Sequence, residues 1–347
     1  MARTLSVDLL YVQDYLLRVP EPVVVLVTSR SFSSGDLDLA GELAAAGCRV
    51  VTAPADHDLA ELAPALAVAT AWIAGTGPVT AAHLDAAPRL QLVARYGVGV
   101  DAVDLAAAAA RGIRVTNTPG ANTGAVADHA VALMLAALRD VASGDRGVRA
   151  GSWAVRRTRQ LGQLTVGVVG LGRIGREVVA RLSGFGCPVL GHDPWVADEQ
   201  VRALGVTPVS LADLARQSDL ITLHTPGEEV LVDAALLAST KPTAILVNTA
   251  RAGLVDEPAL AEALRAGRLR AYASDVLGSE SGGQDNPLLA ADLLDRTLFT
   301  PHAGAQTIEA VDAMGRGAVD AVLAHLRGEQ PATLVPLPAP TPEGVPR

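Results

Sequence analysis

Residues 166–175 read VGVVGLGRIG, and this stretch decides the fold of the chain. An apolar run leads into Gly170, Gly172 and Gly175, and the helical pattern REVVARL follows. In such a turn the first glycine permits the tight bend, the second lets the backbone approach a pyrophosphate, and the third allows close packing of helix on strand. The N–H groups at the start of the helix are then free to bind the phosphates. The stretch predicts a strand, a turn and a helix that bind a dinucleotide.

An acidic residue stands where such a unit needs one. Asp193 ends the next predicted strand, 18 residues after Gly175. A carboxylate at that place accepts hydrogen bonds from a free ribose 2′-OH and repels a 2′-phosphate. The alternative is an ordinary glycine turn followed by an unrelated aspartate, which leaves the rest of the unit unexplained. We therefore expect NAD as the cofactor, in preference to NADP.

The same alternation of strand and helix extends outward in both directions. Short apolar runs separated by helical segments predict parallel strands covered by helices on both faces, which is the doubly wound α/β architecture. The predicted strands are residues 23–30, 49–53, 71–75, 91–97, 113–119, 165–170, 188–193, 219–224, 244–250, 270–276 and 298–302.

The glycine turn stands in the middle of the chain, and at least four predicted strands precede it. A nucleotide-binding domain is therefore expected to be inserted into a first domain. We expect residues 1–120 and 304–347 to form the first domain and residues 121–303 to form the second. The proline-rich tail from Pro331 onward is expected to be loosely ordered.

Composition excludes several kinds of partner. The net charge of −9 repels phosphate backbones and anionic membranes, so we expect neither nucleic acid nor membrane as a partner. The two cysteines, Cys48 and Cys187, form no CxxC pattern and no His-rich spacing is present, so no metal site is predicted. The first apolar stretch contains Asp8 and Asp14 and lacks the layout of a signal peptide. We therefore expect a soluble, cytoplasmic protein.

Several further blocks resemble the D-isomer-specific 2-hydroxy acid dehydrogenase family, which includes phosphoglycerate dehydrogenase. In the family's order they are RYGVGVDAVD (95–104), HDP (192–194), HTP (224–226), VNTARAGLVDE (247–257), SDVLGSE (274–280), NPL (286–288) and TPHAG (300–304). The resemblance implies a Rossmann nucleotide-binding domain inserted in a flavodoxin-like substrate domain, without a regulatory domain. It also implies an NAD-dependent oxidoreductase that passes a hydride between NADH and the C2 carbonyl of a small 2-oxo acid, giving the D-2-hydroxy acid.

The resemblance assigns three catalytic residues, Arg251, Glu280 and His302. A planar guanidinium can clamp the substrate carboxylate and polarise its carbonyl together. An imidazolium can protonate the alkoxide that hydride addition creates. A carboxylate beside the imidazole holds its orientation and stabilises its charged form. Each residue alone also suits a structural role, but their joint appearance in three matching blocks favours catalysis.

The resemblance also implies binding residues. The backbone amides of Gly97, Val98 and Gly99 are expected to bind the substrate carboxylate, and Gly75, Arg251 and His302 to line the same site. Asp275 is expected to contact the nicotinamide carboxamide. The other expected cofactor-binding residues are Gly170, Gly172, Arg173, Ile174, Gly175, Asp193, Thr225, Pro226, Thr249, Ala250, His302 and Gly304. Of the other histidines, His192 and His224 are interpreted as cofactor-adjacent or structural, and His57, His83 and His129 as structural.

Departures from the family bear on the substrate, whose identity stays open. Phosphoglycerate dehydrogenases have a strand-end Arg that helps bind the phosphate, and this chain has Ala74 there, which argues against 3-phosphoglycerate. Ser281 replaces the proline that usually follows the family's glutamate. Arg156, Arg157 and Arg159 form a basic cluster, which is either a solvated face or a second anion site. Such a site would suit a dicarboxylate, phosphorylated or phosphonate-bearing 2-oxo acid.

Two other functions share this fold. The first is a dehydrogenase for formate or another small anion, but those relatives carry Gln where this chain has Glu280. The second is an NAD-sensing binding protein, like the corepressors that share the same three residues. We also expect a homodimer, because residues 125–138 predict an apolar helix and because the family dimerises through its nucleotide domain.

Overall fold

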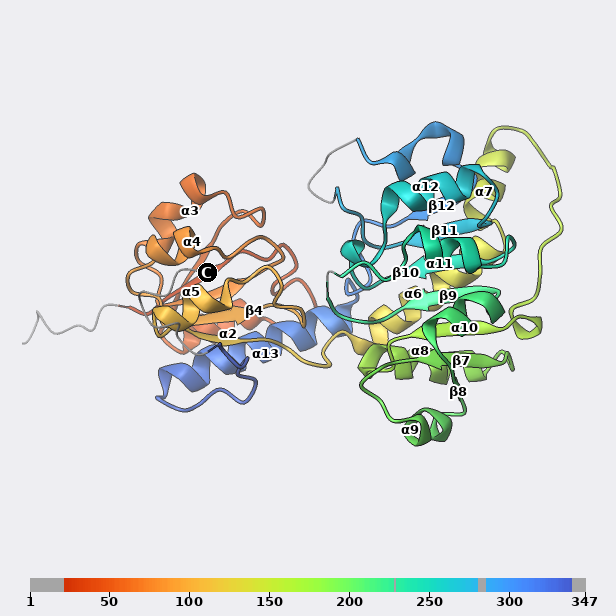
Figure 1. Ribbon diagram of the computed structural model, residues 1–347. Coiled ribbons are helices and arrows are strands. Elements are labelled where there is room, and N and C mark those ends of the chain that lie inside the picture. The colour runs from red at the N-terminus through yellow and green to blue at the C-terminus, as the bar shows by residue number, and fades with distance from the viewer. Residues whose placement is uncertain (1–21, 228, 280–284, 339–347) are drawn as a thin grey trace, which may run out of the picture.

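The chain folds into two parallel β-sheets, each with helices on both faces (Figure 1). This computed structural model describes residues 22–227, 229–279 and 285–338. The first sheet has the order β2-β1-β3-β4-β5, and its strands are β1 (Val24–Val27), β2 (Arg49–Thr52), β3 (Ala71–Ala74), β4 (Leu92–Arg95) and β5 (Arg114–Thr116). The second has the order β12-β11-β10-β9-β6-β7-β8, and its strands are β6 (Val166–Val169), β7 (Val189–His192), β8 (Thr207–Pro208), β9 (Leu220–Leu223), β10 (Ile245–Asn248), β11 (Ala271–Ser274) and β12 (Thr297–Phe299). These orders are flavodoxin-like and Rossmann-like, so the predicted fold class is confirmed.

The first sheet is buried on both faces because its strands are apolar at successive positions. Leu26, Trp72 and Val93 pack on one face, and Val25 and Ile73 pack on the other. Successive side chains of a strand point to opposite faces, so such a strand must be covered twice. The helices on the first face are α3 (Leu59–Leu66), α4 (Ala81–Asp85) and α5 (Leu105–Ala110), and those on the second are α2 (Leu39–Ala45) and α13 (Ile308–Leu326).

The second sheet is covered in the same way. One face packs against α6 (Thr123–Leu138), α8 (Arg173–Ser183) and α9 (Asp198–Ala203). The other packs against α10 (Leu211–Gln217), α11 (Ala234–Ser239) and α12 (Glu257–Arg265). The remaining elements are α7 (Val141–Arg149) and the short 3-10 turns η1 (Leu161–Gln163), η2 (Ala252–Leu254), η3 (Pro287–Leu289) and η4 (Ala291–Leu293).

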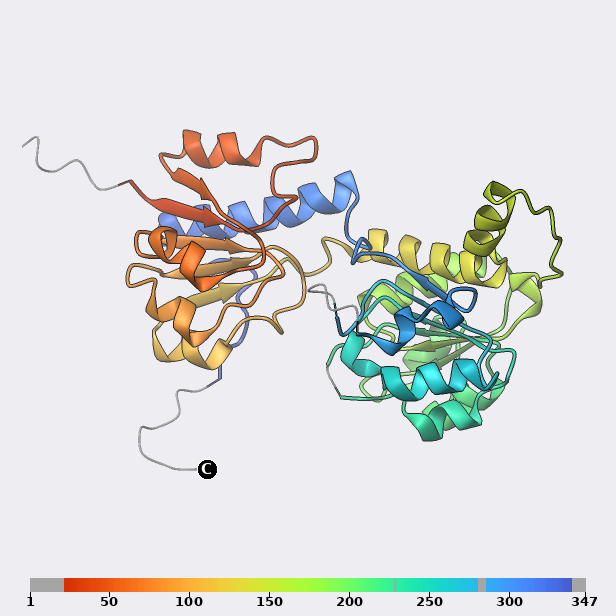
Figure 2. The same cartoon turned by 90° about the horizontal axis from the view of Figure 1, so that it is seen from above.

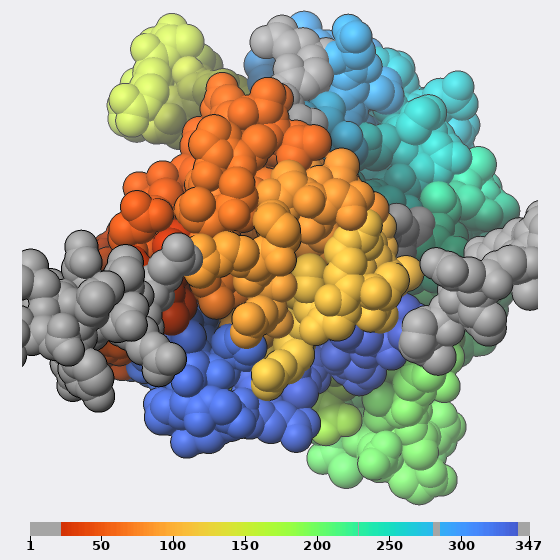
Figure 3. All heavy atoms as spheres, turned by 90° about the vertical axis from the view of Figure 1, so that its left-hand side faces the viewer, coloured from red at the N-terminus to blue at the C-terminus, as the bar shows by residue number. Residues whose placement is uncertain are grey.

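Two helices connect the sheets. Helix α6 follows β5 and packs on α8, β10 and β11, whereas α13 follows β12 and packs on β4 and α2 of the first sheet. Figure 2 shows the two sheets as separate bodies, with α13 returning from the second to the first. In Figure 3 the blue α13 lies directly against the orange and yellow residues of the first sheet. We propose the expected domain boundaries, 120/121 and 303/304, on this packing.

Two details differ from the sequence-based expectations. The tail after Pro331 is not loose up to residue 338, because Val335 N donates to Val115 O (2.8 Å) and Leu334 forms an antiparallel bridge with Thr116 at the edge strand β5. Strand β5 lies at the edge of its sheet and provides the unpaired backbone groups that the tail uses. Strand β8 was not predicted, because two residues carry no periodic signal.

In the part of the chain that the structure describes, no helix combines the length and apolarity needed to cross a membrane.

Candidate active site and nucleotide site

The expected site residues that the structure describes in the second sheet lie at one edge. Gly170 follows β6, Asp193 follows β7, Arg251 lies shortly after β10, Asp275 follows β11 and His302 lies shortly after β12. Because the strands are parallel, their carboxyl ends meet at the same edge of the sheet. The strand order also places the nucleotide-type positions, at β7, β6 and β9, beside the expected catalytic positions at β10, β11 and β12.

The glycine turn has the geometry that its sequence predicts. Gly170 has a φ of +89°, and a Cβ there would lie 2.7 Å from the carbonyl group of His224. A Cβ at Gly175 would lie 2.0 Å from the carbonyl oxygen of Gly170, whereas a Cβ at Gly172 would have no described atom within 4 Å. Gly172 caps α8 without a side-chain hydrogen bond, so the capping residue leaves the first N–H groups of the helix available to a ligand. This arrangement fits a bound pyrophosphate. Of the neighbouring expected residues, Arg173 is exposed and Ile174 packs against the core.

Asp193 fixes the adjoining strand end to this turn. Its Oδ2 accepts a hydrogen bond from Leu171 N (2.7 Å), and its Oδ1 accepts one from Trp195 N (2.9 Å). A cavity of about 470 Å³ lies beside it, lined among others by His192 and Pro194. Each carboxylate oxygen keeps a further lone pair, so the site has both the room and the acceptor that a ribose requires.

Three polar residues, His224, Thr225 and Thr249, lie at the ends of β9 and β10, on the same side of the sheet as the turn. Burial lowers the pKa of His224 to about 3, and its Nε2 contacts Thr222 Oγ1 at 2.9 Å. His224 is therefore neutral and supports the glycine turn from behind, which favours the structural interpretation. Thr249 Oγ1 is buried and has no hydrogen-bond partner among the described residues, as expected for a group that binds a ligand. Thr225 Oγ1 donates to the carbonyl oxygen of Pro226 (3.4 Å).

Arg251 reaches from the second sheet to the first. Its Nε and Nη2 both lie 2.8 Å from Asp101 Oδ2, and its Nη1 donates to the carbonyl oxygen of Ala250 (2.8 Å). A Cβ at Gly99 would lie 2.0 Å from Nη2, so the guanidinium lies against the backbone of that loop. The fold thus brings together the arginine and the loop 97–99 that the sequence assigns to one substrate.

Two residues near Arg251 were missed by sequence reasoning. Asn248 donates from Nδ2 to the carbonyl oxygen of Arg251 and accepts at Oδ1 from Ala250 N, both at 2.9 Å, which fixes the backbone that presents the guanidinium. Arg95 ends β4, and a Cβ at Gly97 would lie 2.7 Å from its Nη1. Burial, with the positive charge of Arg251 nearby, lowers the pKa of Arg95 to about 10. The sequence could have indicated Arg95 by its position just before the loop 97–99.

Arg95 is held with an unused hydrogen-bond donor. In the described part of the chain its Nε is buried and has no hydrogen-bond partner, while Nη1 donates to the carbonyl oxygen of Tyr96. A buried guanidinium with an unsatisfied donor is costly unless a partner binds it. The loop 97–99 therefore lies between two positive charges, Arg95 beside Gly97 and Arg251 beside Gly99.

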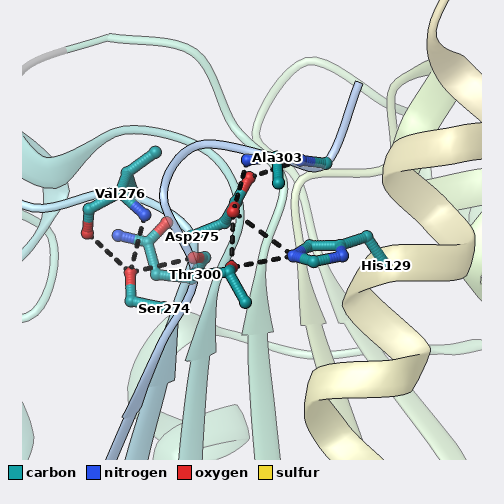
Figure 4. A network of polar contacts seen from close by, with 8 residues as sticks. His129, Ser274, Asp275, Val276, Thr300 and Ala303 are labelled. Carbon is teal, nitrogen blue, oxygen red and sulfur yellow. Dashed lines mark hydrogen bonds and ion pairs between the residues drawn. The ribbon is translucent and has the colours of Figure 1, made fainter. Parts of the chain in front are cut away.

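His302 is exposed and has an unusual backbone. Its φ is +52°, in the left-handed region that non-glycine residues rarely adopt, and its N–H donates to the carbonyl oxygen of Asp275 (3.1 Å). The Asp275 carboxylate accepts from Ala303 N and Gly304 N, each at 2.8 Å (Figure 4). Asp275 thus holds the loop that carries His302, and its expected contact with nicotinamide stays a prediction.

The expected catalytic residue Glu280 and its neighbour Ser281 lie outside the described residues.

Two other expectations concern anion binding. A Cβ at Gly75 would lie 2.5 Å from the carbonyl oxygen of Thr28, so close packing explains this glycine, and its role in substrate binding stays a prediction. Arg156 forms an exposed ion pair with Asp295 (3.3 Å), which precedes β12, and Arg159 lies near Asp219, which precedes β9. Both arginines therefore lie toward the amino ends of the strands, away from His302. These two positions do not favour the interpretation of Arg156 and Arg159 as an anion site beside the expected catalytic residues.

The comparisons with known proteins agree with this geometry. Residues 131–304 match the family described as "D-isomer specific 2-hydroxyacid dehydrogenase, NAD binding domain". The chain is 46% identical over 257 residues to D-3-phosphoglycerate dehydrogenase of Mycobacterium leprae, covering 72% of this chain and 48% of that protein. It is 40% identical over 269 residues to glyoxylate reductase of Korarchaeum cryptofilum, covering 75% of this chain and 80% of that protein. The TT0316 protein of Thermus thermophilus superposes with a TM-score of 0.81 at 35% identity, covering 90% of this chain and 100% of that chain.

These matches extend across both sheets. The chain spans about half the length of the D-3-phosphoglycerate dehydrogenases that it matches, and most of the glyoxylate reductase. The family match encloses all seven strands of the second sheet, from β6 to β12, together with the glycine turn and Asp193. The chain therefore belongs to the D-isomer-specific 2-hydroxyacid dehydrogenase family, and its second sheet forms that family's NAD-binding domain.

Proposed function

We propose that the protein reduces a 2-oxo acid to the D-2-hydroxy acid with NADH. The observation that carries this proposal is the contact of Arg251 with the loop 97–99. An ion pair with Asp101, 150 positions away in the chain, holds Arg251 there. A guanidinium beside the backbone amides of Val98 and Gly99 is suited to a carboxylate with an adjacent carbonyl. The relatives named D-3-phosphoglycerate dehydrogenase and glyoxylate reductase support the same class of substrate.

Each residue has a proposed task at the reacting atoms. The amides of Val98 and Gly99 bind the substrate carboxylate, whereas the amide of Gly97, also expected there, donates to the carbonyl oxygen of Arg95 (3.0 Å). Arg251 binds the carboxylate and polarises the C2 carbonyl. His302 donates a proton to the C2 oxygen, and Glu280 holds the imidazole. NADH, when bound, supplies the hydride to C2. One hydride and one proton together convert the carbonyl to the alcohol.

The substrate class is proposed from Arg95. Its Nε is buried and has no hydrogen-bond partner among residues 22–227, 229–279 and 285–338, and a second anionic group on the substrate would satisfy it. Ala74, fully buried at the end of β3, offers no charge of its own to such a group. We therefore propose a 2-oxo acid with a second carboxylate or a phosphoryl group, bound between Arg95 and Arg251.

The free thiols of Cys48 and Cys187 suit a reducing cytoplasm, where we place the reaction.

A substrate panel tests both parts of the proposal. Glyoxylate, pyruvate, hydroxypyruvate, oxaloacetate, phosphorylated and phosphonate-bearing 2-oxo acids are supplied with NADH, and the nicotinamide absorbance is followed. Oxidation of formate with NAD is tested in parallel. We expect kcat/KM for doubly charged 2-oxo acids to exceed that for singly charged ones by about 10-fold or more, as one charge-assisted contact supplies. Arg95→Gln should remove most of that difference and leave glyoxylate reduction nearly unchanged.

The possible failures are distinct. A preference for singly charged acids that Arg95→Gln does not alter would overturn the substrate class and leave the reductase standing. Turnover of formate alone would identify the other dehydrogenase of this fold. NADH binding without turnover of any acid would overturn the reductase and favour an NAD-sensing binding protein.

A further inference from the structure

A chain of polar contacts links α6 to the loop that carries His302 (Figure 4). His129 Nε2 lies 2.8 Å from Thr300 Oγ1 and 3.3 Å from Asp275 Oδ1, and Thr300 Oγ1 lies 2.5 Å from the same Oδ1. An ionised carboxylate only accepts hydrogen bonds, so the single hydroxyl hydrogen of Thr300 points to Asp275. His129 must then carry its hydrogen on Nε2 and donate it to Thr300. The direction of donation is from His129 to Thr300 to Asp275.

The receiving carboxylate is buried and accepts three hydrogen bonds. The side chain of Asp275 is 4% exposed, and that of His129 is 22% exposed. Besides Thr300, Asp275 accepts from the amides of Ala303 and Gly304, on either side of its carboxylate. A buried carboxylate is stable only while donors surround it, and it turns toward those that remain when one is lost. The orientation of Asp275 therefore depends on the hydroxyl that His129 holds in place.

The loop needs this support because its backbone is strained. His302 lies at a φ of +52°, and its own N–H is held by the carbonyl oxygen of Asp275. Residues in such conformations persist only where the surroundings fix them. A Cβ at Gly304 would lie 3.0 Å from Asp275 Oδ2 and 3.6 Å from His129 Cδ2, so the loop is packed directly against both side chains.

We propose that His129 is a positioning residue for the reaction, and that it orients His302 through Thr300 and Asp275. This inference rests on the proposed function, in which His302 gives the proton to the C2 oxygen. His129 does not contact the reacting atoms itself. It lies on α6, which follows the first crossing between the sheets, whereas Thr300 and His302 lie in the second crossing. The contact therefore ties both crossings together beside the site.

The test compares two substitutions of His129 in the full chain. His129→Leu keeps much of the volume and removes the donor, whereas His129→Gln places an amide N–H near the position of Nε2. We expect His129→Leu to lower kcat about 10- to 100-fold, as small misplacements of a catalytic group do, with the KM for the 2-oxo acid and the Kd for NADH changed less than about 3-fold. His129→Gln should recover most of kcat. A kcat for His129→Leu within about 2-fold of the wild type, or no recovery by His129→Gln in a folded protein, would overturn the proposal.

A second variant covers the case in which His129→Leu fails to fold. Thr300→Val removes the intermediate hydroxyl and keeps the shape, so it should reproduce the loss of kcat. In combination with His129→Gln it should cancel the recovery, because the amide then has no hydroxyl to reach. Full activity of Thr300→Val would contradict a path through this hydroxyl.

A measurement independent of turnover separates this inference from the proposed function. The imidazole NMR signals of His302, assigned by their loss in His302→Ala, should shift in His129→Leu and return in His129→Gln. If the wild type turns over no 2-oxo acid, the proposed function fails, and these signals alone decide whether His129 positions His302. Signals of His302 that do not respond to either substitution would show that it does not.

Discussion

At the scale of single residues, Arg251 depends on the planar shape of its side chain. Two of its nitrogens contact Asp101, and the third contacts the carbonyl oxygen of Ala250. An ammonium group is a point charge and cannot keep these contacts while it binds a carboxylate and a carbonyl. We therefore expect Arg251→Lys to lower kcat/KM at least about 100-fold. The Kd for NADH, measured by fluorescence, should change little.

Asp101→Asn provides the matched control for Arg251. It keeps the shape of the partner and removes its charge, so the guanidinium loosens but stays present. A loss of about 10-fold in kcat/KM is expected, smaller than that of Arg251→Lys. Near-normal turnover of Arg251→Lys would remove Arg251 from the site.

Asp193 is expected to set the choice of cofactor. Its carboxylate lies beside the 470 Å³ cavity and repels a 2′-phosphate, so NADH should be used with at least about 10-fold higher kcat/KM than NADPH. Asp193→Asn keeps an acceptor for Leu171 N and removes the charge, so it should raise the efficiency with NADPH. Equal or better efficiency of the wild type with NADPH, at one concentration of 2-oxo acid, would contradict this role.

Some single residues could be predicted from the sequence and others could not. The glycine turn and Asp193 follow one another within one strand–helix–strand unit, so local spacing revealed both. Arg95 and Arg251 are far apart in the chain. The burial that leaves Arg95 Nε without a partner among the described residues arises only when the sheets are formed. The importance of His129 likewise depends on Thr300 and Asp275, which only the fold brings near.

At the scale of elements, the strands were predictable because parallel strands are buried on both faces. Continuous apolar runs such as those of β1 and β3 mark such strands without any need for periodicity. The tail beside β5 could not be predicted in the same way, because proline interrupts its short apolar run at 334–337 and its pairing depends on a distant edge. The helix α7 was not predicted either, since glycine, serine and aspartate interrupt its sequence.

His224, which follows β9, should make the stability of the protein depend on pH. Burial lowers the pKa of His224 from 6.5 to about 3, so between these values the unfolded chain binds a proton that the folded chain does not. Stability is therefore complete above pH 6.5 and falls as the pH drops toward 3, by about 2 kcal/mol from this residue at pH 5. Urea unfolding at pH 7 and pH 5 measures the change.

His224→Gln separates this residue from the other histidines. Burial also lowers the pKa of His57 and of His325, so both act in the same direction. The variant lacks the titrating group at 224, so its free energy of unfolding should fall less than that of the wild type between pH 7 and pH 5. Equal losses in the two proteins would show that His224 does not carry this dependence.

At the scale of the whole molecule, we still predict a homodimer, but the apolar helix at residues 125–138 no longer supports it. The apolar side chains of α6 are buried against α8 and the second sheet of the same chain, so they do not require a partner. Helix α7 instead has no buried residue, and in the segment after it Trp153 is 83% exposed and Val155 is 93% exposed. A nine-residue helix with an uncovered apolar face is marginal alone in water, so a second copy of the chain is expected to cover it.

Light scattering at micromolar concentration checks the dimer. The wild type should have the mass of two chains, and the double variant Trp153→Ser, Val155→Ser should shift toward one. Trp195→Ser is the matched control, because Trp195 is 77% exposed on the NAD-binding domain and lies outside this segment. A wild type of single-chain mass, or an equal shift in the control, would refute an interface at this segment.

The transfer of hydrogen from the nicotinamide to the substrate tests the central claim most directly. The best 2-oxo acid of the panel is reduced with NADH that carries deuterium at the reactive face of C4, and the product is analysed by mass spectrometry and chiral chromatography. We predict one deuterium per product molecule, bound to C2, and the D configuration. Product without deuterium, deuterium at another carbon, or the L configuration would contradict the assignment of this protein as a D-2-hydroxy acid dehydrogenase.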